Sequence, residues 1–331
     1  RKAVTSYAFL TDCLVKSTWE FATKVQFPTY NPTDAEKLSV ISVGGYGRRE
    51  MAPYSDVDLL FLTPYKITPW AESVIETILY LLWDLKLKVG HSSRSIRDCL
   101  RMGSEDYTIR TAMLEHRFVC GDTGLASELN EKLWKNLFEG TAKEFISAKL
   151  KERENRHAKH GQRYMVEPNV KEGKGGLRDL QSLYWIAKYV YKTQNISDLI
   201  ELNVFRSDEQ EQFDKAEEFL WAVRCQMHHL SDRAIEQLSF DLQVEVATAM
   251  GYKDSQARRG VEIFMQDYFR HATRVGDLTR IFLTSLEAVH AKDEPLLERI
   301  FKRRPKIGEE YAVIHLSLIH ISEPTRRYAI S

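Results

Sequence analysis

Residues 43–62 read Val-Gly-Gly-Tyr-Gly-Arg-Arg-Glu-Met-Ala-Pro-Tyr-Ser-Asp-Val-Asp-Leu-Leu-Phe-Leu and contain the strongest indication of fold class in the chain. Apolar residues over 37–43 and 57–62 predict two strands on either side of a glycine turn. Asp56 and Asp58 are two residues apart at the second strand, so their side chains project from the same face. Paired carboxylates are hard oxygen ligands that suit Mg²⁺. The stretch therefore predicts a magnesium site at Asp56 and Asp58.

Gly44 and Gly45 form the turn between the two strands. Because glycine has no Cβ, the backbone at this turn can approach a phosphate closely. A helix that begins at Tyr46 would point its free N–H groups at the anion, and Arg48 and Arg49 add positive charge nearby. A glycine pair or an Asp-x-Asp alone is common in ordinary turns and solvated edges, so the prediction of a nucleotide site depends on their ordered combination.

The rest of the chain divides into a part with strands and a part with helices. Apolar spacing predicts an opening helix over 4–25, a helix that begins at Pro69 and a third strand over 87–91. Strand signals fade beyond about residue 94. The predicted helices that follow span residues 122–138, 141–160, 177–192, 208–230, 240–250 and 257–290. We therefore expect a small domain with a sheet, followed by a helical domain.

The composition excludes several classes of protein. The chain has 331 residues, room for about two domains, with 47 basic and 47 acidic side chains. A net charge of zero gives no support to a surface that wraps nucleic acid. The four cysteines form no Cys-x-x-Cys pair, and no apolar stretch approaches the roughly 20 residues that span a bilayer. We expect a cytoplasmic enzyme with no nucleic-acid partner and no membrane segment.

The ordered set of strand, glycine turn, Ser-Asp-x-Asp and apolar strand resembles the nucleotidyltransferase core of the DNA polymerase β superfamily. More narrowly, Gly44-Gly-Tyr-Gly-Arg48 and Tyr54-Ser-Asp-Val-Asp-Leu-Leu60 resemble the PII uridylyltransferases, the bifunctional nitrogen-status enzymes of bacteria. Other segments similar to this family are Leu82–Ser92, Ala112–Arg117, Glu167–Asp179, Arg224–Gly251 and Val261–Met265. The resemblance covers roughly residues 8–312.

This resemblance implies an α+β chain: a polymerase β-like nucleotidyltransferase domain over 1–121, with a small mixed sheet, then an all-α helical domain over 122–292. The implied reaction transfers UMP from UTP to a tyrosine of a PII signalling protein and releases pyrophosphate. Asp56 and Asp58 would be the catalytic, Mg²⁺-binding residues. The implied nucleotide-binding residues are Gly44, Gly45, Arg48, Ser55, Lys174 and Arg178.

The family's Gly-Gly-Leu-Arg-Asp signature begins at Gly175 in this chain. In a phosphate-binding loop, Lys174 and Arg178 would reach the nucleotide and Asp179 would orient Arg178. In the alternative, the segment is a helix-entry loop and Arg178–Asp179 is a structural salt bridge.

Two departures from the family pattern concern the site. Arg49 stands where the family usually has glycine, and Met51-Ala52 replaces a bulkier apolar pair, so nucleotide affinity is expected to differ. Superfamily members often have a third carboxylate on the third strand, but residues 87–92 contain none. Glu115 or Asp84 would serve only if the fold brings one of them close.

The histidines are interpreted mainly as structural. His157 and His160 are expected on a solvated helical face rather than at a metal, because Lys, Arg and Glu surround them. His228 is expected to be a hydrogen-bonded residue of a core helix. His91 or Ser92, after the third strand, is a weaker candidate for a nucleotide or metal contact.

Two other functions stay open. An adenylyltransferase of glutamine synthetase shares the acidic strand and a Gly-Gly-x-Arg-Asp loop, although its core usually lacks Gly-Gly-Tyr-Gly-Arg. A non-catalytic nucleotide-binding fragment would agree with Arg49 and the missing third carboxylate. A preference for ATP over UTP would distinguish the adenylyltransferase from a uridylyltransferase. Nucleotide binding without turnover would support the non-catalytic fragment.

The two ends lead to further expectations. The chain begins at Arg1 rather than Met, and residues 316–331 resemble a translated sequencing adapter, so we exclude them from the fold. Residues 293–315 would be a linker toward a His-Asp phosphohydrolase domain. The sequence contains no His-Asp dipeptide. We therefore expect no uridylyl-removing activity and no glutamine sensing in this chain.

Overall fold

A computed structural model describes residues 2–30, 33–160, 165–192, 201, 206–290, 311–314 and 317–320. The chain separates into two compact units, Arg1–Thr284 and Ser285–Ser331. The first unit contains the predicted site and most of the described residues. Among the helices that the structure describes, none is both long and apolar enough to cross a membrane.

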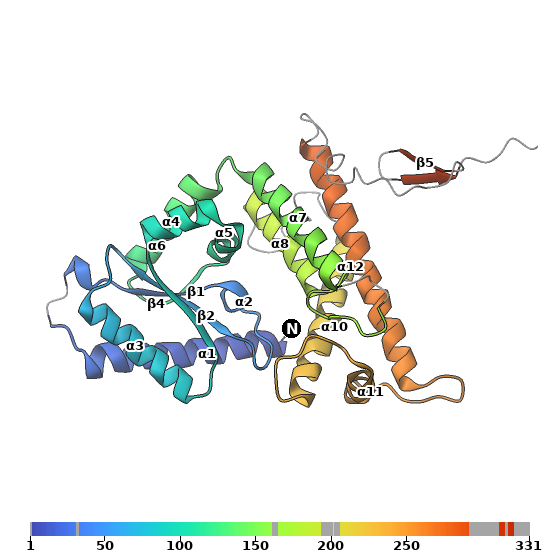
Figure 1. The fold of residues 1–331 in the computed structure, drawn as a ribbon, viewed down its shortest axis with the longest axis horizontal. Coiled ribbons are helices and arrows are strands. Elements are labelled where there is room, and N and C mark those ends of the chain that lie inside the picture. The colour runs from blue at the N-terminus through green and yellow to red at the C-terminus, as the bar shows by residue number, and fades with distance from the viewer. Residues whose placement is uncertain are drawn as a thin grey trace, which may run out of the picture. The chain divides into compact units, whose positions relative to one another are not determined.

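The first unit contains a four-stranded mixed sheet (Figure 1). Its strands are β1 (Ser39–Ser42), β2 (Val57–Thr63), β3 (Val89–Ser95) and β4 (Arg117–Gly121), in the spatial order β3-β2-β1-β4. β1 pairs antiparallel with both β2 and β4, whereas β2 and β3 are parallel. The expected small mixed sheet with helices is therefore confirmed.

The two faces of the sheet are buried by different helices. Along β2, Leu59 and Phe61 enter one hydrophobic cluster and Leu60 and Leu62 enter the other, because successive side chains alternate between faces. The first face is covered by α1 (Lys2–Glu20) and α3 (Pro69–Asp84), as Figure 1 shows. The second is covered by α4 (Ile96–Glu105), α5 (Tyr107–Leu114) and α6 (Thr123–Leu133).

The helical part of the unit follows the predicted order. Its helices are α7 (Ala142–His160), α8 (Leu177–Tyr191), α10 (Ser207–Leu230), α11 (Phe240–Ala249) and α12 (Gly260–His290). Trp185 and Tyr189 of α8 enter the same cluster as α6 and the second face of the sheet. Packing with the sheet therefore continues well past residue 121, the expected end of the first domain.

Several predicted boundaries were wrong. The α-helical part of the opening helix ends at Glu20, and a π-helical turn follows over Phe21–Gln26. A similar π-helical turn over Trp134–Phe138 follows α6. The third strand begins two residues later and ends four residues later than expected, at Val89–Ser95. β4 and α4 were not predicted, and α5 was anticipated only in that Ala112–Arg117 resembles a helix of the family. β4 has only five residues at a sheet edge, so it gives little periodic signal.

The second unit contains a short antiparallel pair, β5 (Tyr311–Ile314) and β6 (Ser317–His320). β5 lies in the stretch expected to be a linker, and β6 lies in residues 316–331, where no regular structure was expected. The similarity of residues 316–331 to an adapter stays a prediction.

Candidate functional site

Asp58 occupies a narrow space between two glycines. The register of β2 and β3 places Asp58 beside Gly90, and the amide of Val43 donates a hydrogen bond of 3.1 Å to the Asp58 carbonyl. A Cβ at Gly44 would lie 2.9 Å from Asp58 Oδ2, and a Cβ at Gly90 would lie 2.7 Å from Oδ1. Both distances are shorter than ordinary contacts, so the space that the Asp58 carboxylate occupies requires glycine at both positions.

The surroundings of Asp58 disfavour the negatively charged form of its carboxyl group. Burial, together with the charges of Asp56 and Glu115, raises the pKa of Asp58 to about 6, whereas Lys171 opposes this rise. Asp56 is exposed beside it. A cation that binds between these carboxylates would relieve their repulsion.

The donor set fits Mg²⁺ with substrate oxygens as further ligands. Among the described residues, no group of three or more His, Cys, Asp or Glu side chains is arranged to hold a metal. Mg²⁺, however, is commonly bound by one or two carboxylates together with water and substrate phosphates. The pair Asp56 and Asp58, with the oxygens of Asp58 approached by glycines rather than larger side chains, meets that requirement.

The glycine turn is shorter and begins earlier than expected. A single helical turn, α2, spans Gly44–Gly47 instead of a helix from Tyr46. Gly44 has φ +60, the left-handed region that favours glycine. The Gly45 carbonyl accepts a 2.9 Å hydrogen bond from the Glu50 amide, which closes the turn. Ser55 follows it, half-buried.

Arg48 is buried between carboxylates. Its Nε donates to Glu50 Oε2 at 2.8 Å, and its Nη1 donates to Glu115, which also accepts a hydrogen bond from the Trp185 indole. The Arg48 side chain is only 8% exposed. Glu115 is thus close enough to Asp58 to affect its pKa, but its carboxylate already binds Arg48 and Trp185.

Arg49 differs from Arg48 in its surroundings. Its side chain is exposed, and its backbone has φ 62. A side chain in this left-handed region costs roughly 1–2 kcal/mol, a cost that glycine avoids. The backbone conformation at this position thus favours glycine over arginine.

The loop before α8 contains the two predicted cationic contacts. Lys174 is exposed. Arg178 donates to Gln181 at 2.9 Å and to Glu172 at 3.2 Å, and its guanidinium lies 5.3 Å from the centre of the Trp185 ring. The expectation that Asp179 orients or pairs with Arg178 was wrong.

Asp179 instead joins the loop to α7. Its fully buried carboxylate accepts hydrogen bonds from Arg156 at 2.6 Å, from His157 at 2.9 Å and from the Gly175 amide at 2.9 Å. Burial alone would raise the pKa of Asp179, but the hydrogen bond from His157 and the charges of Arg153, His157 and Arg156 hold it well below its usual range. The expectation that His157 lies on a solvated face was therefore wrong. The side chain of His160 lies outside the described residues.

Two further histidines can be placed. His228 is fully buried, and its Nδ1–H donates to the Pro53 carbonyl at 2.5 Å, which agrees with the structural position expected for it. The carbonyl can only accept, so Nδ1 must carry the proton. His91 is exposed and packs edge-on against Trp83, with 6.2 Å between ring centres.

Sequence reasoning missed Lys171, whose charge interacts with that of Asp58, and Glu236, whose Oε1 lies 3.9 Å from Lys171 Nζ. Glu236 accepts hydrogen bonds from Arg224 at 2.6 and 2.9 Å. Burial raises the pKa of Glu236, but the neighbouring His228 side chain and the hydrogen bonds and charge of Arg224 outweigh this and bring it to about 2. The Glu167–Asp179 segment was recognised, yet nothing in its spacing distinguished Lys171 from Lys174.

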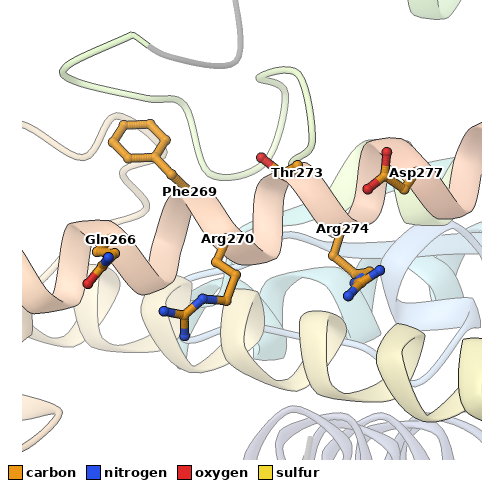
Figure 2. Close-up of a pocket in the computed structure, with 6 residues that line it drawn as sticks. All are labelled: Gln266, Phe269, Arg270, Thr273, Arg274 and Asp277. Carbon is orange, nitrogen blue, oxygen red and sulfur yellow. The ribbon is translucent and has the colours of Figure 1, made fainter.

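A separate pocket lies along α12 (Figure 2). Figure 2 shows Arg270 and Arg274 pointing to the same side of the helix, and Arg270 donates to Asp267 at 2.7 Å. The pocket is lined by Gln266, Phe269, Arg270, Thr273, Arg274 and Asp277. It includes none of the predicted site residues.

Known proteins similar to this chain are bacterial uridylyltransferases. Residues 144–283 match the family described as GlnD PII-uridylyltransferase. The bifunctional uridylyltransferase/uridylyl-removing enzyme of Ruegeria pomeroyi is 61% identical over 314 residues, 95% of this chain and 35% of the relative. Those of Cereibacter sphaeroides and Rhodopseudomonas palustris are 60% and 49% identical, over 95% and 92% of this chain and 34% and 33% of the relatives. The chain spans about a third of the length of these relatives, and over that span it is homologous to proteins named bifunctional uridylyltransferase/uridylyl-removing enzyme.

Proposed function

We propose that this chain transfers UMP from UTP to a tyrosine hydroxyl of a PII signalling protein and releases pyrophosphate. The observation that supports it best is the pair Asp56 and Asp58, with Asp58 enclosed by Gly44 and Gly90. The names of the relatives support uridylyl as the transferred group, and the family description supports PII as the acceptor.

Asp56 and Asp58 would hold Mg²⁺, which when bound would neutralise the triphosphate and stabilise the departing pyrophosphate. With a pKa of about 6, Asp58 is mostly ionised at pH 7–8 and therefore able to bind a cation. Gly44 and Gly45 would let the backbone approach the phosphates. We propose Arg48, Ser55, Lys174 and Arg178 as further nucleotide-binding residues.

In the reaction, the acceptor oxygen forms a bond to the α-phosphorus of UTP and the bond to pyrophosphate breaks. A tyrosine hydroxyl has a pKa near 10, so it must lose its proton as it attacks. The buried ion pairs of Arg48 would keep the glycine turn fixed while the phosphates change geometry.

The test is intact-mass analysis of a PII protein after incubation with the full chain, Mg²⁺ and either UTP or ATP. We expect a uridylyl-sized gain with UTP, abolished by Asp56→Asn with Asp58→Asn. Asp208→Asn, which removes an exposed carboxylate on α10, is the matched control and should retain activity. A gain with ATP alone would instead support an adenylyltransferase. Nucleotide binding without any gain would support a non-catalytic fragment.

A further inference from the structure

Lys171 is placed by a loop whose backbone is fixed. Its amide donates to Asn169 Oδ1 at 3.1 Å, and its carbonyl accepts from the Arg178 amide at 2.9 Å. Asn169 Oδ1 also accepts from the Glu172 amide at 2.7 Å. Gly175, with φ +82, packs closely on the backbone of Ala272 in α12. These contacts hold the Lys171 backbone in place and involve none of its side-chain atoms.

The Lys171 ammonium has counter-ions but no hydrogen-bonded acceptor among the described residues. Its Nζ lies 3.9 Å from Glu172 Oε1 and 3.9 Å from Glu236 Oε1, beyond the roughly 2.7–3.2 Å of a hydrogen bond. Glu172 is bound by Arg178 at 3.2 Å, and Glu236 by Arg224 at 2.6 Å. Arg156 Nε also lies 3.8 Å from Glu172 Oε2, so four cations share these two carboxylates.

A chain of contacts brings this ammonium toward the acidic strand. The Pro53 carbonyl, just before Asp56, accepts from His228, whose Nε2 lies 3.7 Å from Glu236 Oε1. Glu236 is in turn one of the two neighbours of Lys171. The charges of Lys171 and Asp58 also interact, so the two side chains lie within electrostatic reach of each other.

The other cations of this loop do not combine partial burial with an unused hydrogen-bond donor. Lys174 is exposed, and Arg178 is occupied by Gln181 and Glu172. The Lys171 side chain is 30% exposed, so it is open to a ligand without being fully solvated. Burial and the charges of Arg224 and Arg178 lower its pKa, and an anion would relieve that repulsion.

We propose that Lys171 is a triphosphate-binding residue, whose ammonium contacts the β- or γ-phosphate of a nucleotide at Asp56 and Asp58. This inference rests on the proposed function. A triphosphate supplies the oxygen acceptors that the ammonium lacks, and ammonium–phosphate hydrogen bonds are charge-assisted. The alternative role, in which Lys171 only balances Glu172 and Glu236, predicts no dependence on the number of phosphates.

The experiment compares affinities for UTP and UMP, with Mg²⁺, by titration calorimetry of the full chain. We expect Lys171→Gln to weaken UTP binding on the order of 10-fold or more and to change UMP binding little. Lys171→Arg should restore most of the UTP affinity, because it keeps the charge. Lys253→Gln removes an exposed positive charge from the loop before α12 and should change neither affinity.

Unchanged UTP affinity in Lys171→Gln, or equal losses for UTP and UMP, would overturn the inference and leave the proposed function intact. Failure of the folded wild-type chain to bind either nucleotide would overturn both. If Lys171→Gln lowers the melting temperature, the ratio of UTP affinity to UMP affinity is also measured for Lys171→Met, whose unbranched side chain preserves the packing of the stem. A lower ratio in that variant supports the assignment, and an unchanged ratio rejects it.

Discussion

Asp58→Asn should stabilise the metal-free protein while it weakens metal binding. The pKa of Asp58 is raised from 3.8 to about 6 by burial first and by Asp56 and Glu115 second. A carboxyl whose folded pKa is raised contributes stability fully below its unfolded pKa, and this contribution is lost as pH rises through about 6. Asparagine resembles the neutral carboxyl and avoids that loss at high pH.

The size of the effect follows from the two pKa values. The difference between 3.8 and about 6 corresponds to roughly 3 kcal/mol at about 1.4 kcal/mol per pH unit. Asp58 is partly exposed, so solvent screening reduces this to about 1–2 kcal/mol. For a unit of this size, 1 kcal/mol shifts the melting temperature by about 2–4 °C.

The assay is thermal and urea unfolding in EDTA from pH 8 down to pH 4. We expect Asp58→Asn to be more stable than wild type at pH 8, with the difference shrinking toward pH 4. Added Mg²⁺ should stabilise wild type but not the variant. Asp208→Asn, which removes an exposed charge, should change stability by only a few tenths of a kcal/mol. Equal or lower stability of Asp58→Asn at pH 8 in EDTA would refute the reasoning.

Three other substitutions test separate parts of the structure. Gly90→Ala places a Cβ 2.7 Å from Asp58 Oδ1, and the displaced carboxylate should slow UMP transfer on the order of 100-fold in an initial-rate assay; an unchanged rate would contradict this. Asp179→Asn leaves buried cations unpaired and should cost about 3–5 kcal/mol in urea unfolding, so a loss below about 1 kcal/mol would show that the network matters little. Arg49→Gly relieves the strain of a side chain at φ 62, and because glycine loses more conformational freedom on folding, the net gain in stability should be up to about 1 kcal/mol; a lower melting temperature would count against backbone strain.

Local sequence signals predicted the elements that have strong periodicity. β2 was predicted within one residue because its apolar run is buried on both faces, and α3 was predicted from Pro69 at its first turn. β4 was missed because it is a five-residue edge strand, and its pairing with β1 depends on residues 75 or more positions away. Such pairings leave no short-range pattern.

The site shows the same division. The pair Asp56 and Asp58 was predicted from two-residue spacing on a strand; β2 begins at Val57, after Asp56, but the two carboxylates still lie close enough to interact. The positions of Glu115 and Lys171 depend on long-range packing, since Glu115 binds Arg48 across 67 residues and Lys171 belongs to the helical part of the unit. The pairing of Asp179 with α7 rather than with its neighbour Arg178 also follows from packing, because the carboxylate faces inward from the first turn of α8.

Trp185 joins α8 to the glycine turn through one carboxylate, since its indole and Arg48 share Glu115. If α8 moved away, Glu115 would lose its neutral donor and water would reach an ion pair whose members are only 8% and 3% exposed. Local unfolding of the glycine turn and local unfolding of α8 should therefore occur together. Backbone amides of residues 44–50 and 177–191 would exchange with deuterated solvent at rates that rise and fall together, although more than 120 residues separate the two segments.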